Sequence, residues 1–177
     1  ALLGEREVAD RHGLLRQPAL ALSEAGLAPV ELAEKEGLAL INGTDGMLGM
    51  LVIAAHDLRL ILRTADVAAA MSVEALLGTD RVFAADLQAL RPHPGQQASA
   101  ANLRALLAGS GIVASHRGPE CTRVQDAYSL RCIPQIHGSV REVIAYAKWL
   151  LRIELNSATD NPLIFIDDET GQIDVIS

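Results

Sequence analysis

The chain has few aromatic side chains and few cysteines, and both shortages narrow the possible architectures. Only two Phe, two Tyr and one Trp occur among 177 residues, although half of the residues are apolar. The core must therefore be built mainly from Ala, Leu, Val and Ile, and chains rich in Ala and Leu favour helices because these side chains lose little freedom there. Two cysteines, Cys121 and Cys132, are too few for a disulfide framework or a four-thiolate metal site. We expect both to be reduced thiols.

Long apolar runs and positive charge are also scarce. No apolar run approaches the ~20 residues needed to cross a bilayer, and no basic stretch followed by an apolar one opens the sequence. Lys and Arg number 15 against 22 Asp and Glu, which gives a net charge of −7. This balance argues against a general binder of nucleic acid or of anionic membranes. We expect a soluble, cytoplasmic protein with no nucleic-acid or membrane partner.

Patterns for metal and nucleotide binding are missing as well. The five histidines form no His-x-x-x-His pair, and none has a carboxylate at metal-ligand spacing. No glycine-rich phosphate loop of standard spacing occurs. The sequence therefore predicts no metal site and no nucleotide site.

One very long helical pattern dominates what is present. Residues 44–77 carry apolar side chains at three- and four-residue steps, and the opposite side of this pattern is also rich in Ala, Ile and Met. Thr44 can cap such a helix and Gly78 can stop it. A helix that is apolar over most of its circumference packs inside a bundle or between subunits. We expect this helix to exceed about 25 residues.

Other segments complete a mainly α pattern. Helices are predicted over residues 27–40, over residues 96–108 and, behind the first-turn proline Pro134, to about residue 156. The convincing strand-like run is confined to residues 163–166. The predicted fold class is mainly α, in the form of a long-helix bundle.

Three side chains that could bind a ligand or transfer a proton follow one another in a region of poor helical periodicity. Gln125, Tyr128 and Arg131 stand three residues apart, so a local helix would place them on a drifting but shared face. A guanidinium can grip a carboxylate through two hydrogen bonds, an amide can orient it, and a phenol can transfer a proton. The group is either an anion site or a cluster that only packs a loop.

Asn42 stands directly before the long helix, in the sequence Asn-Gly-Thr. The simple interpretation is a turn followed by a helix cap. The functional alternative uses the Asn42 amide as a donor near a helix N-terminus, where an anion or a developing oxyanion is stabilised.

Four runs together resemble the aromatic amino acid ammonia-lyase family. They are residues 35–44 (KEGLALINGT), 91–96 (RPHPGQ), 124–132 (VQDAYSLRC) and 154–163 (ELNSATDNPL), and they cover nearly the whole chain in the order of the family. The resemblance implies a long-helix bundle that is part of the helical core of fumarase/aspartase-like enzymes. It also implies that residues 1–177 form a single internal fragment of the central helical domain of a larger lyase.

The resemblance further implies an activity and roles for individual residues. Members of the family eliminate ammonia from an amino acid, using an electrophilic methylidene-imidazolone made from an internal Ala-Ser-Gly triplet. On this basis Tyr128 and Asn42 are the catalytic candidates, with Asn42 next to the prosthetic group. Arg131 and Gln125 are the substrate-binding candidates, with Arg131 on the carboxylate. The implied partners are a small amino acid substrate and further copies of the chain in a homotetramer.

One departure from the family pattern matters. The 177 residues contain no Ala-Ser-Gly triplet, because Ser110-Gly111 is preceded by Gly109. We therefore expect this chain alone to be inactive, and we expect it to self-associate through residues 44–77. Residues 124–132 favour histidine ammonia-lyases, which make urocanate in histidine catabolism. A lyase for tyrosine or phenylalanine, an aminomutase, and a non-catalytic helical assembly module remain alternatives.

Overall fold

The computed structural model describes residues 3–119, 121–167 and 169–176. The chain divides into two compact units. The terminal unit combines residues 1–45 with residues 159–177, and the helical unit spans residues 46–158. Each unit is described by itself. Within the described ranges, no helix is both long enough and apolar enough to span a bilayer.

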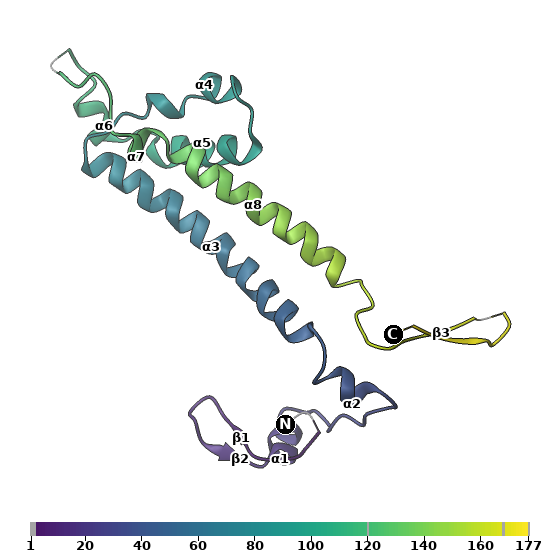
Figure 1. Ribbon diagram of the computed structural model, residues 1–177. Helices are drawn as coiled ribbons and strands as arrows, with labels where there is room; N and C mark the ends of the chain where they lie inside the picture. Colours follow the sequence, from purple (N-terminus) through teal and green to yellow (C-terminus); the bar gives the residue numbers. More distant parts are fainter. Residues whose placement is uncertain (1–2, 120, 168, 177) are drawn as a thin grey trace. The chain divides into compact units, whose positions relative to one another are not determined.

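Helix α3 (Asp45–Ala75) is the longest element and has 31 residues (Figure 1). The predicted long helix is thereby confirmed, but its end differs from the expectation. Leu77, not Gly78, adopts the left-handed conformation, with φ of 52°, and the Gly78 N–H donates to the carbonyl of Val73 at 2.7 Å. This is the Schellman arrangement, with leucine where glycine is usual. Gly78 is needed for space, because a Cβ there would lie 3.3 Å from Asp126 Oδ2.

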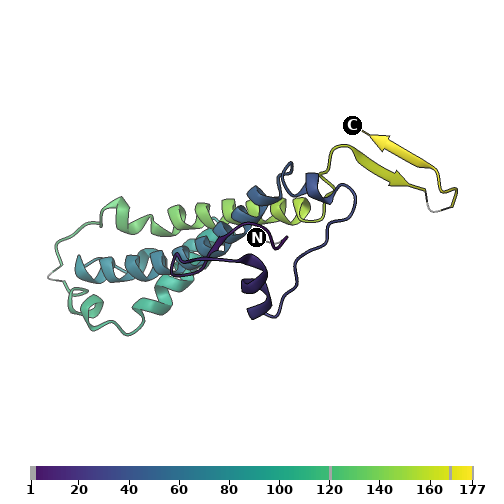
Figure 2. The ribbon, with the colours of Figure 1, turned by 90° about the horizontal axis from the view of Figure 1, so that it is seen from below.

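Helix α8 (Ile133–Glu154) lies beside α3 in both views (Figures 1 and 2). Pro134 occupies its first turn, as predicted. Helix α5 (Pro94–Leu107), also predicted, crosses the first turns of α8. Where the two helices cross, Gly95 of α5 meets Gly138 of α8. A Cβ on Gly95 would lie 2.2 Å from the carbonyl oxygen of Gly138. The two helix backbones touch because neither residue has a side chain.

Short elements gather at the end of the helical unit where α3 finishes and α8 begins. They are η1 (Arg81–Phe83), α4 (Ala85–Ala89), α6 (Gly111–Ser115) and α7 (Tyr128–Arg131). The hydrophobic core lies where they meet the three long helices, and its buried members are Ala70, Val73, Phe83, Ala100, Leu103, Leu107, Val113, Leu130 and Ile133. A single aromatic ring takes part in this group, so the prediction of an aliphatic core is confirmed.

A buried carboxylate joins the three long helices. Asp66 of α3 is 1% exposed. It accepts hydrogen bonds from Asn102 Nδ2 of α5 at 2.7 Å and from Arg141 Nη2 of α8 at 2.6 Å, and His137 Nδ1 of α8 lies 2.9 Å from its other oxygen. Arg141 Nε also donates to Ser99 Oγ of α5 at 2.8 Å. We call these five residues the Asp66 cluster.

The terminal unit contains short elements from both ends of the chain. They are β1 (Val8–Ala9), β2 (Leu15–Arg16), α1 (Pro18–Glu24), α2 (Glu36–Ala39), β3 (Leu163–Ile166) and β4 (Ile173–Ile176). β1 pairs with β2, and β3 pairs with β4, both antiparallel. β3 confirms the predicted strand, whereas α1 and the other strands were not predicted.

The predicted helix over residues 27–40 is wrong for most of its length, because only α2 forms within it. Lys35 directly precedes α2 and has a left-handed backbone, with φ of 69°. Its ammonium group forms an ion pair with Asp160 at 2.6 Å and donates a hydrogen bond to the carbonyl of Pro162. The side chain of Lys35 is thus held by a distant part of the chain, and the local apolar pattern carries no sign of this contact.

Candidate functional site

Helix α7 and the residues before it bring three predicted site residues together. Arg131 Nη1 donates a hydrogen bond to Gln125 Oε1. The Arg131 Cζ atom lies 4.9 Å from the centre of the Tyr128 ring, a cation–π contact. We call these three residues the Gln125–Tyr128–Arg131 cluster. The contacts show that the side chains meet, and their roles in binding or catalysis stay predictions.

The cluster keeps hydrogen-bonding capacity for a ligand. Arg131 has five N–H donors in a planar fork, and Gln125 is its one hydrogen-bond partner in the part of the chain that the structure describes. The remaining donors match the two oxygens of a carboxylate. Tyr128 is 70% exposed, so its side chain is accessible from solvent.

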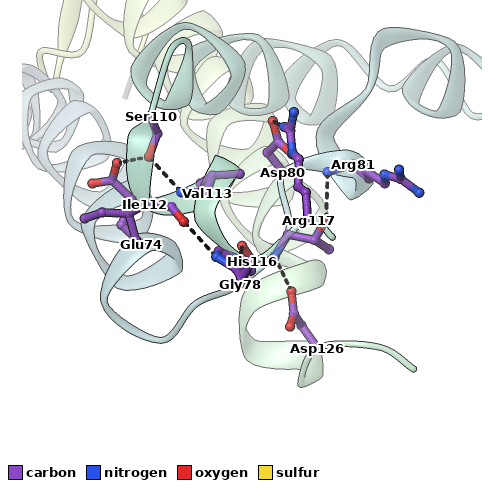
Figure 3. A network of polar contacts seen from close by, with 11 residues as sticks. Glu74, Gly78, Asp80, Arg81, Ser110, Ile112, Val113, His116, Arg117 and Asp126 are labelled. Atoms are coloured by element: carbon purple, nitrogen blue, oxygen red, sulfur yellow. Dashed lines mark hydrogen bonds and ion pairs between the residues drawn. The ribbon is translucent and has the colours of Figure 1, made fainter. Parts of the chain in front are cut away.

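The loop before α7 is held against the turn that ends α3. The Asp126 carboxylate, whose side chain is 5% exposed, accepts the N–H of Thr79 at 2.6 Å, a contact drawn in Figure 3. Arg123 Nη1 donates to the carbonyls of Leu76 and Leu77, at 2.8 and 3.1 Å. These contacts satisfy backbone groups that a helix end leaves without partners.

A histidine makes a further connection to the same turn (Figure 3). One ring nitrogen of His116 lies 2.9 Å from the carbonyl of Gly78, and the other lies 2.7 Å from the carbonyl of Ile112. Both partners are acceptors, so both hydrogen bonds form together only when each ring nitrogen carries a proton. Nearby, Ser110 Oγ caps α6 and donates to Glu74 Oε1 at 2.6 Å, which ties α6 to α3.

A cavity of about 270 Å³ opens beside Gln125 and Asp126. Three guanidinium groups line it, those of Arg81, Arg117 and Arg123, against the single carboxylate of Asp126. Arg117 forms an ion pair with Asp80, and Arg123 lies 3.6 Å from Asp126, so carboxylates balance two of these charges. Gln125 is the member of the cluster that lines this cavity.

Asn42 lies in the terminal unit, apart in the chain from the cluster, which belongs to the helical unit. Its N–H donates to the carbonyl of Leu38 at 2.9 Å, directly after α2. Its side chain is exposed and has no hydrogen-bond partner within the described ranges. The amide is thus available as a donor. The structure brings Gln125, Tyr128 and Arg131 together. Asn42 belongs to the other unit of the chain.

Two carboxyl groups of the terminal unit, those of Asp160 and Asp167, have lowered pKa values. The Lys35 side chain, with a smaller contribution from the Asn161 N–H, holds the pKa of Asp160 below its usual 3.8. The hydrogen bonds from Thr170 and Glu169 likewise lower the pKa of Asp167. Within the described part of the chain no group of three His, Cys, Asp or Glu residues could hold a metal ion, and Cys121 and Cys132 are free thiols.

Comparison with known proteins determines the family. The family profile described as aromatic amino acid lyase matches residues 1–177. The chain belongs to the aromatic amino acid lyase family. This lyase chain is 54% identical to the histidine ammonia-lyase of Streptomyces avermitilis over 166 residues, which are 94% of the chain and 32% of that protein. It spans about a third of the length of the curated relatives it matches.

Solved structures of related enzymes share the fold of this lyase chain. A histidine ammonia-lyase from Trypanosoma cruzi is 44% identical, with a TM-score of 0.72, and the match covers 99% of this chain and 31% of that one. A tyrosine aminomutase from Streptomyces globisporus is 41% identical, with a TM-score of 0.76, and the match covers 97% of this chain and 35% of that one. The prediction of a mainly helical lyase core is confirmed.

Two structural features of this lyase chain were missed by sequence reasoning. Asp126 stands inside one of the runs that carry the resemblance, but no role was assigned to it. Its position next to Gln125 was the available signal. The Asp66 cluster had no such signal, because the partners of Asp66 lie 36, 71 and 75 residues away.

Proposed function

We propose that this chain is the central segment of a histidine ammonia-lyase, which eliminates ammonia from L-histidine to give urocanate in histidine catabolism. The observation that carries the proposal is the 54% identity to a histidine ammonia-lyase over 94% of the chain. The Gln125–Tyr128–Arg131 cluster supports it, because its donors suit an amino acid carboxylate.

Each residue of the cluster has a distinct task in this proposal. Arg131 binds the substrate carboxylate through the N–H groups that Gln125 leaves free. Gln125 holds the guanidinium through its carbonyl oxygen and can donate from its own amide to the ligand. Tyr128 is close enough to Arg131 to exchange a proton with a bound amino acid.

The family resemblance implies a methylidene-imidazolone prosthetic group, whose Ala-Ser-Gly triplet does not occur in the 177 residues. When present, this group supplies the electrophile to which the amine of the substrate adds. The donor set fits it, because the exposed Asn42 amide has no partner among the described residues and can donate to the oxygen of such a group. Asn42 would thus orient and polarise the group without taking a proton.

The proposal includes an assembly. Apolar side chains along α3 face solvent in this chain, and Met50, Ile53 and Leu60 are 65%, 64% and 65% exposed. Apolar surface of this extent marks an interaction site. We propose that α3 packs against further copies of the chain, in a homotetramer for the complete enzyme and with two-fold symmetry for the 177-residue chain.

The activity is tested in the complete lyase that contains this segment. Purified enzyme is mixed with L-histidine, and the absorbance of urocanate is followed. Parallel reactions with L-tyrosine and L-phenylalanine are followed through their unsaturated acids and through β-amino acids. Urocanate formation supports the proposal. Turnover of tyrosine, with a β-amino acid as the product, would instead favour an aminomutase, the second candidate suggested by the 41% identical tyrosine aminomutase.

The 177-residue chain is tested separately. We expect no urocanate from it, because Asn42 and the Gln125–Tyr128–Arg131 cluster can bind and orient an amino acid but supply no electrophile. Sedimentation at micromolar concentration should show self-association. Measurable urocanate would contradict the first expectation, and a clean monomer would contradict the second.

A further inference from the structure

The turn after α3 offers polar backbone groups that the loop before α7 uses. Leu77 has a left-handed backbone, and this directs the chain away from the helix axis at Gly78 and Thr79. The carbonyls of Leu76 and Leu77 and the N–H of Thr79 are then free of intrahelical partners. Arg123 and Asp126 bind these three groups from the loop.

Asp126 is the innermost residue of that loop. Its side chain is 5% exposed, whereas Gln125 and Ala127 on either side are exposed. The carboxylate makes a charge-assisted hydrogen bond of 2.6 Å with Thr79 N–H, a kind of bond that is stronger than a neutral one. Arg123 Nη1 lies 3.6 Å from its other oxygen and balances the charge.

Gly78 permits this close approach. A side chain there would place its Cβ 3.3 Å from Asp126 Oδ2 and 3.2 Å from Val73 Cγ1. The turn is therefore shaped to receive the carboxylate, and Figure 3 shows Asp126 directed at the backbone beside Gly78.

We propose that Asp126 is a positioning residue for substrate binding, acting through Gln125. This inference rests on the proposed function. Asp126 fixes the backbone one residue after Gln125, and so fixes where Gln125 Oε1 meets Arg131 Nη1. With that contact in place, the guanidinium stays over the Tyr128 ring, with its free donors turned to the substrate carboxylate. Asp126 itself touches no substrate.

The experiment measures kcat and KM in the complete lyase with Asp126→Ala and Asp126→Asn. We expect Asp126→Ala to raise KM for the amino acid about tenfold or more, with a smaller change in kcat, because carboxylate binding is lost first. Asn keeps an oxygen that can accept the Thr79 N–H, so Asp126→Asn should recover most of the KM. The exposed residue Asp174 of β4 lies outside α3 and gives a matched control, and Asp174→Asn should leave both constants unchanged.

A double-mutant cycle separates positioning from a purely structural role. If Asp126 acts through Gln125, the Asp126→Ala change should alter KM less than about twofold when Gln125 is already alanine. An equal fold-change from Asp126→Ala in both backgrounds would overturn the proposal, and so would an unchanged KM in Asp126→Ala. If Asp126→Ala fails to fold, Asp126→Glu, which keeps the charge but moves the carboxylate by one methylene group, takes its place in the same cycle with the same expected outcomes.

The outcome also distinguishes this proposal from the proposed function. A wild-type enzyme that uses tyrosine but not histidine refutes the histidine assignment alone, and the same cycle is then run with tyrosine. A wild-type enzyme with no turnover of any aromatic amino acid overturns both. Normal wild-type turnover with unaltered Asp126 variants overturns the positioning role alone.

Discussion

Replacing Asp66 with alanine should destabilise the helical unit strongly. Asp66 is 1% exposed, and its carboxylate is the common acceptor for Asn102, His137 and Arg141. Alanine removes this acceptor while the guanidinium of Arg141, whose side chain is 21% exposed, stays between the helices. Breaking a buried ion pair by removing one partner costs about 3–5 kcal/mol, because the other charge remains without compensation.

The magnitude can be bounded from the geometry. Three hydrogen bonds to a charged acceptor would be worth about 1.5–3 kcal/mol each if they were independent. They are not independent, and Asn102 is exposed, so water replaces part of what is lost. For an enzyme of the length of the matched relatives, about three times this chain, 1 kcal/mol shifts Tm by roughly 1 °C, so an expected loss of about 3–5 kcal/mol corresponds to a fall in Tm of about 3–5 °C.

The assay is thermal unfolding of the complete lyase, followed by far-ultraviolet circular dichroism at one fixed protein concentration, since assembly also shifts Tm. The Asp66→Asn variant should show a smaller fall, because Asn keeps one acceptor oxygen. The control Asp174→Asn removes the same charge from an exposed position of β4 and should change stability by no more than about 0.5 kcal/mol. An Asp66→Ala variant that melts within about 1 °C of the wild type, roughly the effect of 1 kcal/mol in an enzyme of this length, would refute the reasoning.

Three further predictions follow from other contacts. Gly95→Ala should cost about 1–3 kcal/mol in a urea titration, because the new Cβ would lie 2.2 Å from a backbone oxygen. Gly49→Ala, with nothing within 4 Å of the added carbon, should be neutral or stabilise α3 by up to about 1 kcal/mol, and equal losses in both variants would contradict the argument. Arg131→Lys in the complete lyase keeps the charge but loses the planar fork, so kcat/KM should fall at least tenfold, about 1.4 kcal/mol; unchanged kinetics would exclude the carboxylate role. The contact with Lys35 lowers the pKa of Asp160 below 3.8, so its contribution to stability is complete above the unfolded pKa and is lost as the pH falls through the lower folded value. A carboxyl NMR titration should show Lys35→Met returning Asp160 towards 3.8, and an unmoved titration would count against the ion pair.

The parts of the fold that were predicted from sequence are those that local patterns determine. α3, α5 and α8 each carry an uninterrupted helical period with recognisable end signals, and the strand at residues 163–166 is a compact apolar run. The prediction for residues 27–40 is wrong outside α2, where Lys35 has a left-handed backbone and its side chain contacts Asp160 and Pro162, which the local pattern does not reveal. The stop of α3 was placed on Gly78, while the left-handed residue is Leu77, because the glycine serves the approach of Asp126 instead.

The candidate site likewise combines residues that the sequence could predict with residues that it could not. Gln125, Tyr128 and Arg131 stand close together in the sequence, so a short helical turn is sufficient to bring them into contact. Asp126 and Arg123 act on a turn more than forty residues earlier, and no periodicity connects positions so far apart. Long-range contacts of this kind depend on tertiary packing, which local propensity does not encode.

The contact between Lys35 and Pro162 also orders events in time. The two residues are 127 positions apart, and at about 5–20 residues per second of synthesis the segment with Lys35 is made roughly 6–25 s before its partner. All residues of the helical unit, 46–158, are synthesised within that interval. A nascent chain halted just before Asp160 therefore contains the whole helical unit, while Lys35, and with it the stretch leading to Asn42, still lacks its anchor. The terminal unit cannot form this contact until synthesis of the helical unit is complete, although 45 of its 64 residues precede that unit in the chain.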